Sequence, residues 1–246
     1  EEIVAHNPDY PDRQFNLAFA ELMAGRWQSG WQHYEARWAT DNPVFSKRYP
    51  TIQNWNREPL HGKRLLFFAE QGFGDTLQFC RFAPLFANAG ANVVVECQPG
   101  LKTLLQSLPN IEQVIEQGET VSDVDYKLPM LSAPLVFGVT PENIPNGTDG
   151  RYLTVPAAEG FEKTDRLKVG LVWAGRDRAV LNNRSLPSAL LPKLFEQTES
   201  SVEWFSLQVD KSEEATRILS AAPNVSRLAS RITDFESTAR MVSAMD

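Results

Sequence analysis

Residues 64–76, RLLFFAEQGFGDT, decide the fold of the first half of the chain. An apolar run, Arg64–Ala69, is followed by a glycine-containing turn and then by apolar residues at helical spacing. A continuous apolar run next to glycine is typical of a strand buried on both faces of a parallel sheet. We therefore predict a β-strand over 64–69 and a helix over 75–88, joined by the turn Glu70–Asp75.

Alternation of strand and helix patterns continues along the rest of the chain. A stretch rich in proline and glycine, 140–165, interrupts it and predicts the connection between two lobes. Strands that alternate with helices indicate βαβ units and a mainly parallel sheet. The expected fold class is therefore α/β, with strands over 92–96, 112–115, 126–128, 168–173, 202–207 and 225–228, and helices over 99–108, after Pro187, over 212–220 and over 235–245.

The first part of the chain, to about Arg57, shows no strand pattern. Apolar residues recur at helical spacing on either side of Gly25, which predicts an antiparallel pair of helices of roughly 14 residues each. Asn7–Pro8 recurs as Asn42–Pro43, close to the period of about 34 residues of tetratricopeptide repeats. The segment is therefore TPR-like, and an ordinary helical hairpin is the alternative.

Three tryptophans in this segment, Trp27, Trp31 and Trp38, permit two interpretations. Their helical spacing predicts that they form the core of the hairpin. The alternative is a stacking platform for a ligand, because an indole ring offers a large flat face.

The composition argues against several functional classes. The chain has 246 residues, with 24 basic and 31 acidic side chains and a formal net charge of −7, so we expect no nucleic-acid partner. Two cysteines are too few for a disulfide framework, and three scattered histidines show no metal-ligand spacing, so we expect no metal. The absence of a signal peptide and of an apolar run of about 20 residues predicts a cytoplasmic protein without a transmembrane segment.

The turn between the first strand and its helix is the first candidate site. Gly72 and Gly74 allow tight backbone turns and the close approach of a ligand. The helix N-terminus, with Asp75 at or near the N-cap, suits an anionic group. The alternative is an ordinary N-cap in a glycine-rich turn. Leu77 stands where a dinucleotide fingerprint needs its third glycine, which argues against a nucleotide-dependent oxidoreductase.

The second candidate site follows the strand over 168–173. Residues 173–175, Trp-Ala-Gly, come at the carboxyl end of that strand, where open α/β sheets bind ligands. Arginines at 176, 178 and 184 suit phosphate because the planar guanidinium can bind two oxygens at once. Gln208 holds the analogous position after the strand over 202–207. The alternative is a solvated basic loop with a helix N-cap at Ser185.

These segments together resemble a group of bacterial tetratricopeptide-repeat proteins with a C-terminal glycosyltransferase-like region related to the ADP-heptose:LPS heptosyltransferases. The resemblance is carried by residues 65–79 (LLFFAEQGFGDTLQF), 169–175 (VGLVWAG), 183–187 (NRSLP) and 205–208 (FSLQ). It implies a GT-B architecture of two Rossmann-like lobes. The implied domains are a TPR-like helical segment over 1–57, a first lobe on the acceptor side over 58–157, and an incomplete second lobe on the donor side over 158–246.

The resemblance also implies a reaction and roles for particular residues. An inverting, metal-independent glycosyltransferase would move a sugar from a nucleotide-sugar substrate to an acceptor hydroxyl, with no cofactor. Asp75 takes the place of the family's general base. Acceptor binding would fall to Gln71, Gly72, Gly74 and Thr76, and donor binding to Trp173, Ala174, Gly175, Arg184, Ser185 and Gln208. The TPR-like segment implies a protein acceptor or partner.

The chain departs from the family in one place. The family's second lobe continues into an Asp-Thr-x-x-x-His-Leu turn that grips the diphosphate, and the sequence ends at Asp246 before any such turn. It also begins at Glu1 rather than Met, so we expect a chain truncated at both ends, with the activity belonging to a longer parent. The alternative function is a non-catalytic scaffold, in which the helical segment recruits a partner and the α/β region is degenerate.

Overall fold

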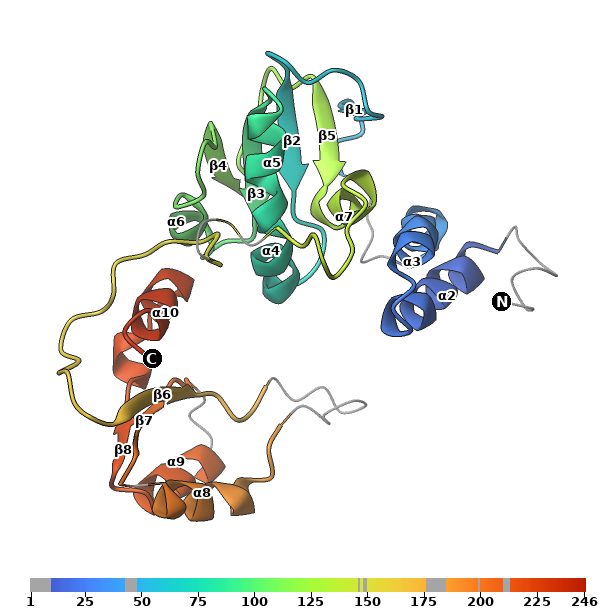
Figure 1. The fold of residues 1–246 in the computed structure, drawn as a ribbon. Coiled ribbons are helices and arrows are strands. Elements are labelled where there is room, and N and C mark those ends of the chain that lie inside the picture. Colours follow the sequence, from blue (N-terminus) through green and yellow to red (C-terminus); the bar gives the residue numbers. More distant parts are fainter. Residues whose placement is uncertain are drawn as a thin grey trace. The chain divides into compact units, whose positions relative to one another are not determined.

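The computed structural model describes residues 10–42, 48–145, 147, 150–175, 185–198, 200–209 and 213–246. The chain divides between Thr154 and Val155 into two compact units, and each unit contains a parallel sheet with helices (Figure 1). The α/β fold class predicted from the sequence is therefore confirmed. The division falls inside the stretch 140–165, whose proline and glycine content predicted a connection.

A five-stranded parallel sheet with the order β1-β5-β2-β3-β4 organises the first unit. Its strands are β1 (Gln53–Asn54), β2 (Arg64–Phe68), β3 (Asn92–Cys97), β4 (Gln113–Glu116) and β5 (Tyr126–Pro129). In the central strand, Leu66 lies opposite Val94 of β3 and Lys127 of β5. The chain runs outward from β2 through β3 and β4 and then returns to β5, so the strand order reverses between β2 and β5.

The segment after β2 covers one face of this sheet (Figure 1). The single helix predicted over 75–88 is instead divided into α4 (Phe73–Phe79), the 3₁₀-helix η3 (Cys80–Phe82) and α5 (Ala83–Asn88). Pro84 explains the division, because a proline fits the first turn of a helix and cannot continue a preceding one. Phe86 of α5 packs against Phe67 of β2, with ring centroids 5.4 Å apart, and this contact joins the helix to the sheet.

Short helices follow the other strands of the first unit. α6 (Lys102–Leu105) comes after β3 and is shorter than the helix predicted over 99–108. The 3₁₀-helix η4 (Met130–Ser132) and α7 (Ala133–Val136) come after β5 and have no counterpart in the sequence prediction. Their sequence gave little signal because four helical residues are too few to establish a periodicity.

The opposite face of the sheet is covered without a crossover helix. Residues 117–125, which join β4 to β5 and are all described, contain no helix, although such crossovers are usually helical. Loops and the end of the N-terminal segment take the place of that helix. They cover Leu66, Phe68, Val94 and Ile115 with the side chains of Trp38, Tyr49, Ile52, Val121 and Val124.

Helices α2 (Pro11–Met23) and α3 (Trp27–Tyr34) precede the sheet, and α3 continues as the 3₁₀-helix η1 (Glu35–Ala39). Gly25 separates α2 from α3 with a φ of 76°, a conformation that favours glycine. The predicted pair is present, but α3 has 8 residues where roughly 14 were expected, because its last turn tightens into η1. β1 also corrects the expectation that this part holds no strand; its polar residues gave no strand pattern.

Two of the tryptophans attach the N-terminal helices to the α/β region. Trp31 packs edge-on against Tyr34 and against Phe79 of α4, with ring centroids 5.5 and 5.7 Å away. Trp38 packs over the sheet face that contains Phe68. These rings therefore do more than fill a hairpin core, and the helical segment forms part of the first compact unit.

The second unit is built on the parallel sheet β6 (Leu167–Leu171), β7 (Val202–Ser206) and β8 (Val225–Arg227), in that order. Trp204 of β7 packs on one face against Phe195, and Phe205 packs on the other against Phe161. Such alternation is expected for a strand covered on both sides. Helices α8 (Leu191–Gln197) and α9 (Glu213–Ser220) supply the first cover, and α10 (Phe235–Val242) contributes to the second (Figure 1).

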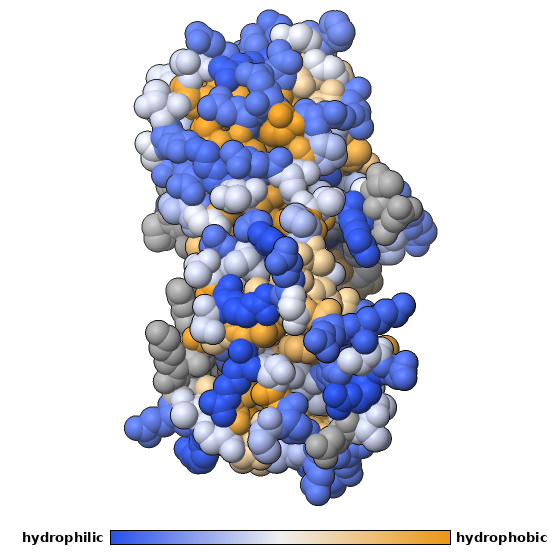
Figure 2. All heavy atoms as spheres, turned by 90° about the vertical axis from the view of Figure 1, so that its left-hand side faces the viewer, coloured by the Kyte–Doolittle hydropathy of each residue, from blue (hydrophilic) through white to orange (hydrophobic). Residues whose placement is uncertain are grey.

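None of the helices in the described part of the chain is long and apolar enough to cross a bilayer. On the face shown in Figure 2, hydrophobic residues form patches that are separated by hydrophilic ones. Apolar atoms scattered in this way are ordinary on a folded protein surface.

Candidate functional site

The glycine-rich turn lies at the carboxyl end of β2 and leads directly into α4. The N–H of Gly72 donates to Asp75 Oδ2 at 3.0 Å, and the carbonyl of Gly72 accepts from the N–H of Thr76 at 3.1 Å. Gly74 is exposed, and a Cβ added there would meet nothing within 4 Å. The turn therefore offers open backbone next to a fixed carboxylate, and the bond to Gly72 uses only one of the two Asp75 oxygens.

A buried glutamine holds this turn from behind. Gln98, directly after β3, donates through Nε2 to the carbonyl of Gln71 at 2.5 Å and accepts at Oε1 from Thr76 Oγ1 at 2.8 Å. Gln71 Nε2 in turn donates to the hydroxyl of Tyr34 at 2.5 Å. Gln71 and Thr76 thus both have internal partners, and Thr76 is only 1% exposed. The acceptor-binding roles of Gln71, Gly72, Gly74 and Thr76 stay predictions.

A fully buried arginine from η1 joins the N-terminal segment to the same turn. Arg37 donates from Nε to Glu70 Oε2 at 2.8 Å and from Nη2 to Glu70 Oε1 at 3.0 Å, a bidentate pair. Its other donors reach Glu35 Oε1 at 2.7 Å and Ser132 Oγ at 2.9 Å. Glu70 Oε1 also accepts from the N–H of Leu131, at 2.9 Å, in the turn after β5.

This cluster occupies the place where the strand order of the sheet reverses. Glu70 follows β2 and Leu131 follows β5, so the hydrogen bond between them crosses the gap between the carboxyl ends of those strands. Open parallel sheets bind ligands at such a point. Here the guanidinium of Arg37 lies between the two turns. The open surface of the glycine-rich turn therefore lies at Gly72, Gly74 and Asp75.

Burial sets the protonation of this cluster. It raises the pKa of Tyr34 to about 12, against a smaller opposing effect of the hydrogen bond from Gln71. Burial alone disfavours a charged Arg37, but the carboxylates of Glu70 and Glu35 together outweigh this effect and raise the pKa of Arg37. At neutral pH, Tyr34 is therefore a neutral phenol and Arg37 a cation.

The second candidate site lies at the carboxyl ends of β6 and β7. Gln208 Oε1 accepts from the backbone N–H groups of Trp173 and Ala174, each at 3.2 Å, and Nε2 donates to the carbonyl of Ala174 at 3.1 Å. The N–H of Gly175 donates to Ser185 Oγ at 3.3 Å. The structure thus brings these five predicted residues together. Their donor-binding role stays a prediction, and Arg176, Arg178 and Arg184 lie outside the described residues.

The two units use the same device. In each unit a glutamine close behind a strand binds the turn that follows the preceding strand along the chain: Gln98, directly after β3, binds the turn after β2, and Gln208, two residues after β7, binds the turn after β6. Both glutamines are buried, at 9% and 6% exposure. A buried amide can satisfy several backbone or hydroxyl groups at once, so each turn is held in one conformation.

Four residues of the site lay outside the sequence prediction: Arg37, Glu70, Gln98 and Ser132. Glu70 carried the clearest signal, because a carboxylate directly after an apolar strand needs a partner when it is buried. The sequence does not say which of its arginines supplies that partner. Arg37 and Glu70 are 33 residues apart, so only the fold brings them together.

The described part of the chain contains no group of three or more His, Cys, Asp or Glu side chains able to hold a metal. Cys80 and Cys97 are free and buried. Burial raises the pKa of each thiol to about 12, so neither is a thiolate at neutral pH.

Comparison with known proteins gives a partial likeness. The chain is 34% identical over 90 residues to Protein FlbA of Caulobacter vibrioides, a match that covers 34% of this chain and 15% of that protein. No family model and no solved structure matches the chain. The likeness therefore spans a small share of either protein and assigns no function to this chain.

Proposed function

We propose that the protein is a glycosyltransferase of the heptosyltransferase-like, GT-B type, with the acceptor bound by the first unit and a nucleotide-sugar donor by the second. The observation that carries the proposal is the device shared by the two units. Each unit has a parallel sheet whose first long strand ends in a glycine-containing turn, held by a buried glutamine. Ligands of open α/β sheets bind at such turns.

Asp75 is the proposed general base. Its carboxylate takes the proton of the acceptor hydroxyl while the hydroxyl oxygen forms a bond to the anomeric carbon of the donor sugar. The bond from that carbon to the diphosphate breaks, the electron pair leaves with the nucleoside diphosphate, and the anomeric configuration inverts. The hydrogen bond from Gly72 to Asp75 Oδ2 supports this role, because it fixes the carboxylate on a rigid turn.

A scaffold without catalysis is the second candidate, and a different observation favours it. Helix α2 exposes Phe19 at 47% and Met23 at 90%, one helical turn apart. Apolar side chains exposed on one helix face are suited to contact another protein. The proposed TPR-like helical segment would then recruit a partner, as the alternative interpretation of the sequence expects.

Calorimetric titration with a panel of nucleotide sugars separates the two candidates. The glycosyltransferase proposal predicts saturable binding of at least one of the ADP, UDP, GDP and CMP sugars. Gln208→Leu should weaken that binding at least about tenfold, because it frees the turn at Trp173 and Ala174. Gln106→Leu, an exposed glutamine of the first unit, serves as the control. If none of the nucleotide sugars binds, the glycosyltransferase proposal is rejected and the scaffold proposal is favoured.

A further inference from the structure

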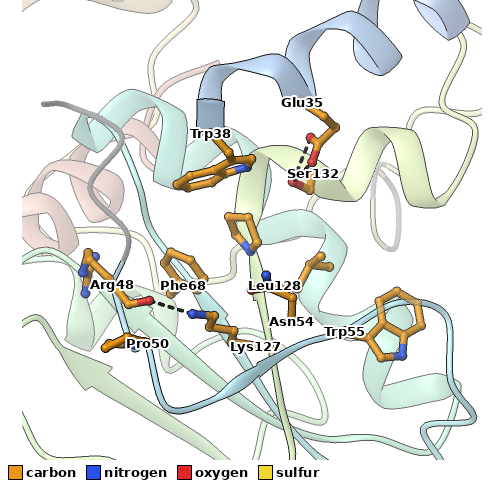
Figure 3. A pocket seen from close by; sticks show the side chains of 11 residues that line it. Glu35, Trp38, Arg48, Pro50, Asn54, Trp55, Phe68, Lys127, Leu128 and Ser132 are labelled. Carbon is orange, nitrogen blue, oxygen red and sulfur yellow. Dashed lines mark hydrogen bonds between the residues drawn. The ribbon is translucent and has the colours of Figure 1, made fainter. Parts of the chain in front are cut away.

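A cavity of about 430 Å³ lies beside Trp38, over the face of the first sheet that contains Phe68 (Figure 3). Its volume falls within the range of about 300–1,000 Å³ that small-molecule sites occupy. Its lining comes from η1, from the segment 48–55, from β2 and from β5 with the turn after it. None of the lining residues belongs to the turn 70–76, and the cavity meets the cluster around Arg37 only at Glu35 and Ser132.

Aromatic rings form much of the wall. Trp38 and Phe68 border the space from opposite sides in Figure 3, and Trp55 lies at its far end. The guanidinium of Arg37 lies over the Trp38 ring, 4.6 Å from its centroid, and helps to fix the indole. Pre-positioned aromatic faces suit a planar ring, which can stack or pack edge-on against them.

A lysine provides the most distinctive polar group. Lys127 of β5 is only 8% exposed, and its Nζ donates to the backbone carbonyls of Arg48 at 2.8 Å and Tyr49 at 2.6 Å. An ammonium group has three N–H donors, so one donor remains after the bonds to these two carbonyls. Burial lowers the pKa of Lys127. Across the described residues, no carboxylate lies within 4.0 Å of this Nζ.

The other charged groups that line the cavity are already paired. Arg48 forms an ion pair with the buried carboxylate of Glu96, which also accepts from the hydroxyl of Tyr49. Glu35 accepts from Arg37 at 2.7 Å and from Ser132 Oγ at 2.9 Å. A cation buried without a counter-ion is costly, and an anion that enters beside it offsets that cost. Lys127 is the group that an incoming anion would pair with.

We propose that this cavity is a binding site for a small aromatic carboxylate, with the ring against Trp38 and Phe68 and the carboxylate on the ammonium of Lys127. The cavity and its aromatic walls select a flat apolar body, and the lysine selects a single negative charge. This assignment is independent of the glycosyltransferase proposal. Of the three tryptophans that the sequence offers as a stacking platform for a ligand, Trp38 is the one to which this proposal gives that role.

Calorimetry with indole-3-carboxylate and the neutral indole-3-carboxamide tests the proposal on the unaltered chain. The two probes share a ring system and differ in charge, so their comparison needs no variant. We expect the acid to bind with a Kd below about 1 mM and at least about tenfold more tightly than the amide, because a charge-assisted hydrogen bond is lost. Failure of the acid to bind, or a difference of less than about tenfold, would overturn the proposal.

Variants then place the probe in this cavity. Trp38→Leu should weaken binding of the acid at least about tenfold, whereas Trp27→Leu, a tryptophan of the same unit that does not line the cavity, should leave it within about twofold. Lys127→Met should bring the acid to the affinity of the amide. Trp38→Leu with unchanged affinity, in a chain with the wild-type circular dichroism spectrum, would refute the site.

Discussion

Replacing Arg37 by methionine should be among the most damaging single changes in the first unit. The substitution removes the bidentate pair with Glu70 and the bonds to Glu35 and Ser132. The Glu70 side chain, which is only 2% exposed, then lacks its cation. Removing one partner of a buried ion pair costs about 3–5 kcal/mol. Proteins have a total stability of about 5–15 kcal/mol, so the loss is a large fraction of it.

The assay is urea unfolding followed by circular dichroism, together with calorimetric melting. At about 2–4 °C per kcal/mol for a chain of this size, the melting temperature of the first unit should fall by about 6–20 °C. Arg26→Met is the matched control. Its arginine side chain is 51% exposed and 3.9 Å from Glu21, so the control should cost less than about 1 kcal/mol.

A double variant separates the loss of the Arg37–Glu70 attraction from the cost of leaving the Glu70 carboxylate buried and unpaired. Arg37→Met with Glu70→Met removes both ions, and it should be more stable than Arg37→Met alone by about 1–3 kcal/mol, because no unpaired carboxylate remains buried. A single variant within about 1 kcal/mol of wild type, or a double variant no more stable than the single one, would contradict this expectation.

Three further predictions concern the core, the tyrosines and the second unit. Phe67→Ala should cost about 3–5 kcal/mol in urea unfolding, because the ring is fully buried against Phe86, whereas Phe73→Ala, 40% exposed, should cost far less. Burial raises the pKa of Tyr34 and of Tyr49 to about 12, so the neutral phenols are favoured in the folded state; stability should hold below pH 10 and fall as the pH rises toward 12. An alkaline absorbance titration of the wild type should therefore show tyrosines that ionise with a pKa of about 12, and the Tyr34→Phe, Tyr49→Phe double variant should lack them. Gln208→Leu should destabilise the second unit by about 1–3 kcal/mol, read from the unfolding of the tryptophan-rich second core, since it leaves the backbone groups of Trp173 and Ala174 without their partner.

The central strands could be predicted because burial on both faces imposes a simple pattern. RLLFF and NVVVEC are almost continuously apolar, and the structure places both as strands in the middle of the sheet. β1 and α7 could not be predicted in the same way. Two to four residues establish no periodicity, and β1 exists because β5 offers it an edge to pair with.

In the candidate site, too, features set by neighbouring residues could be predicted, and contacts between distant parts of the chain could not. The glycine-rich turn, Asp75 and the position of Gln208 at a strand end could be predicted, since each is a local feature of strand, turn and helix. Arg37 and Lys127 could not be singled out, because an arginine or lysine in the sequence gives no sign of being buried. Their importance comes from partners far along the chain, such as Glu70 for Arg37 and the carbonyl of Arg48 for Lys127.

The most direct test of the proposed function is the release of nucleoside diphosphate from the nucleotide sugar that binds in calorimetry, compared between wild type and Asp75→Asn. Asparagine can still accept the hydrogen bond from Gly72, so the turn is kept and the base is lost. Asp123→Asn, an exposed residue with a φ of 55° that asparagine tolerates, is the control. We expect release by wild type and by the control, and a rate at least about 100-fold lower for Asp75→Asn with donor binding unchanged. Equal rates in the wild type and Asp75→Asn, or no release by wild type, would contradict the proposed function.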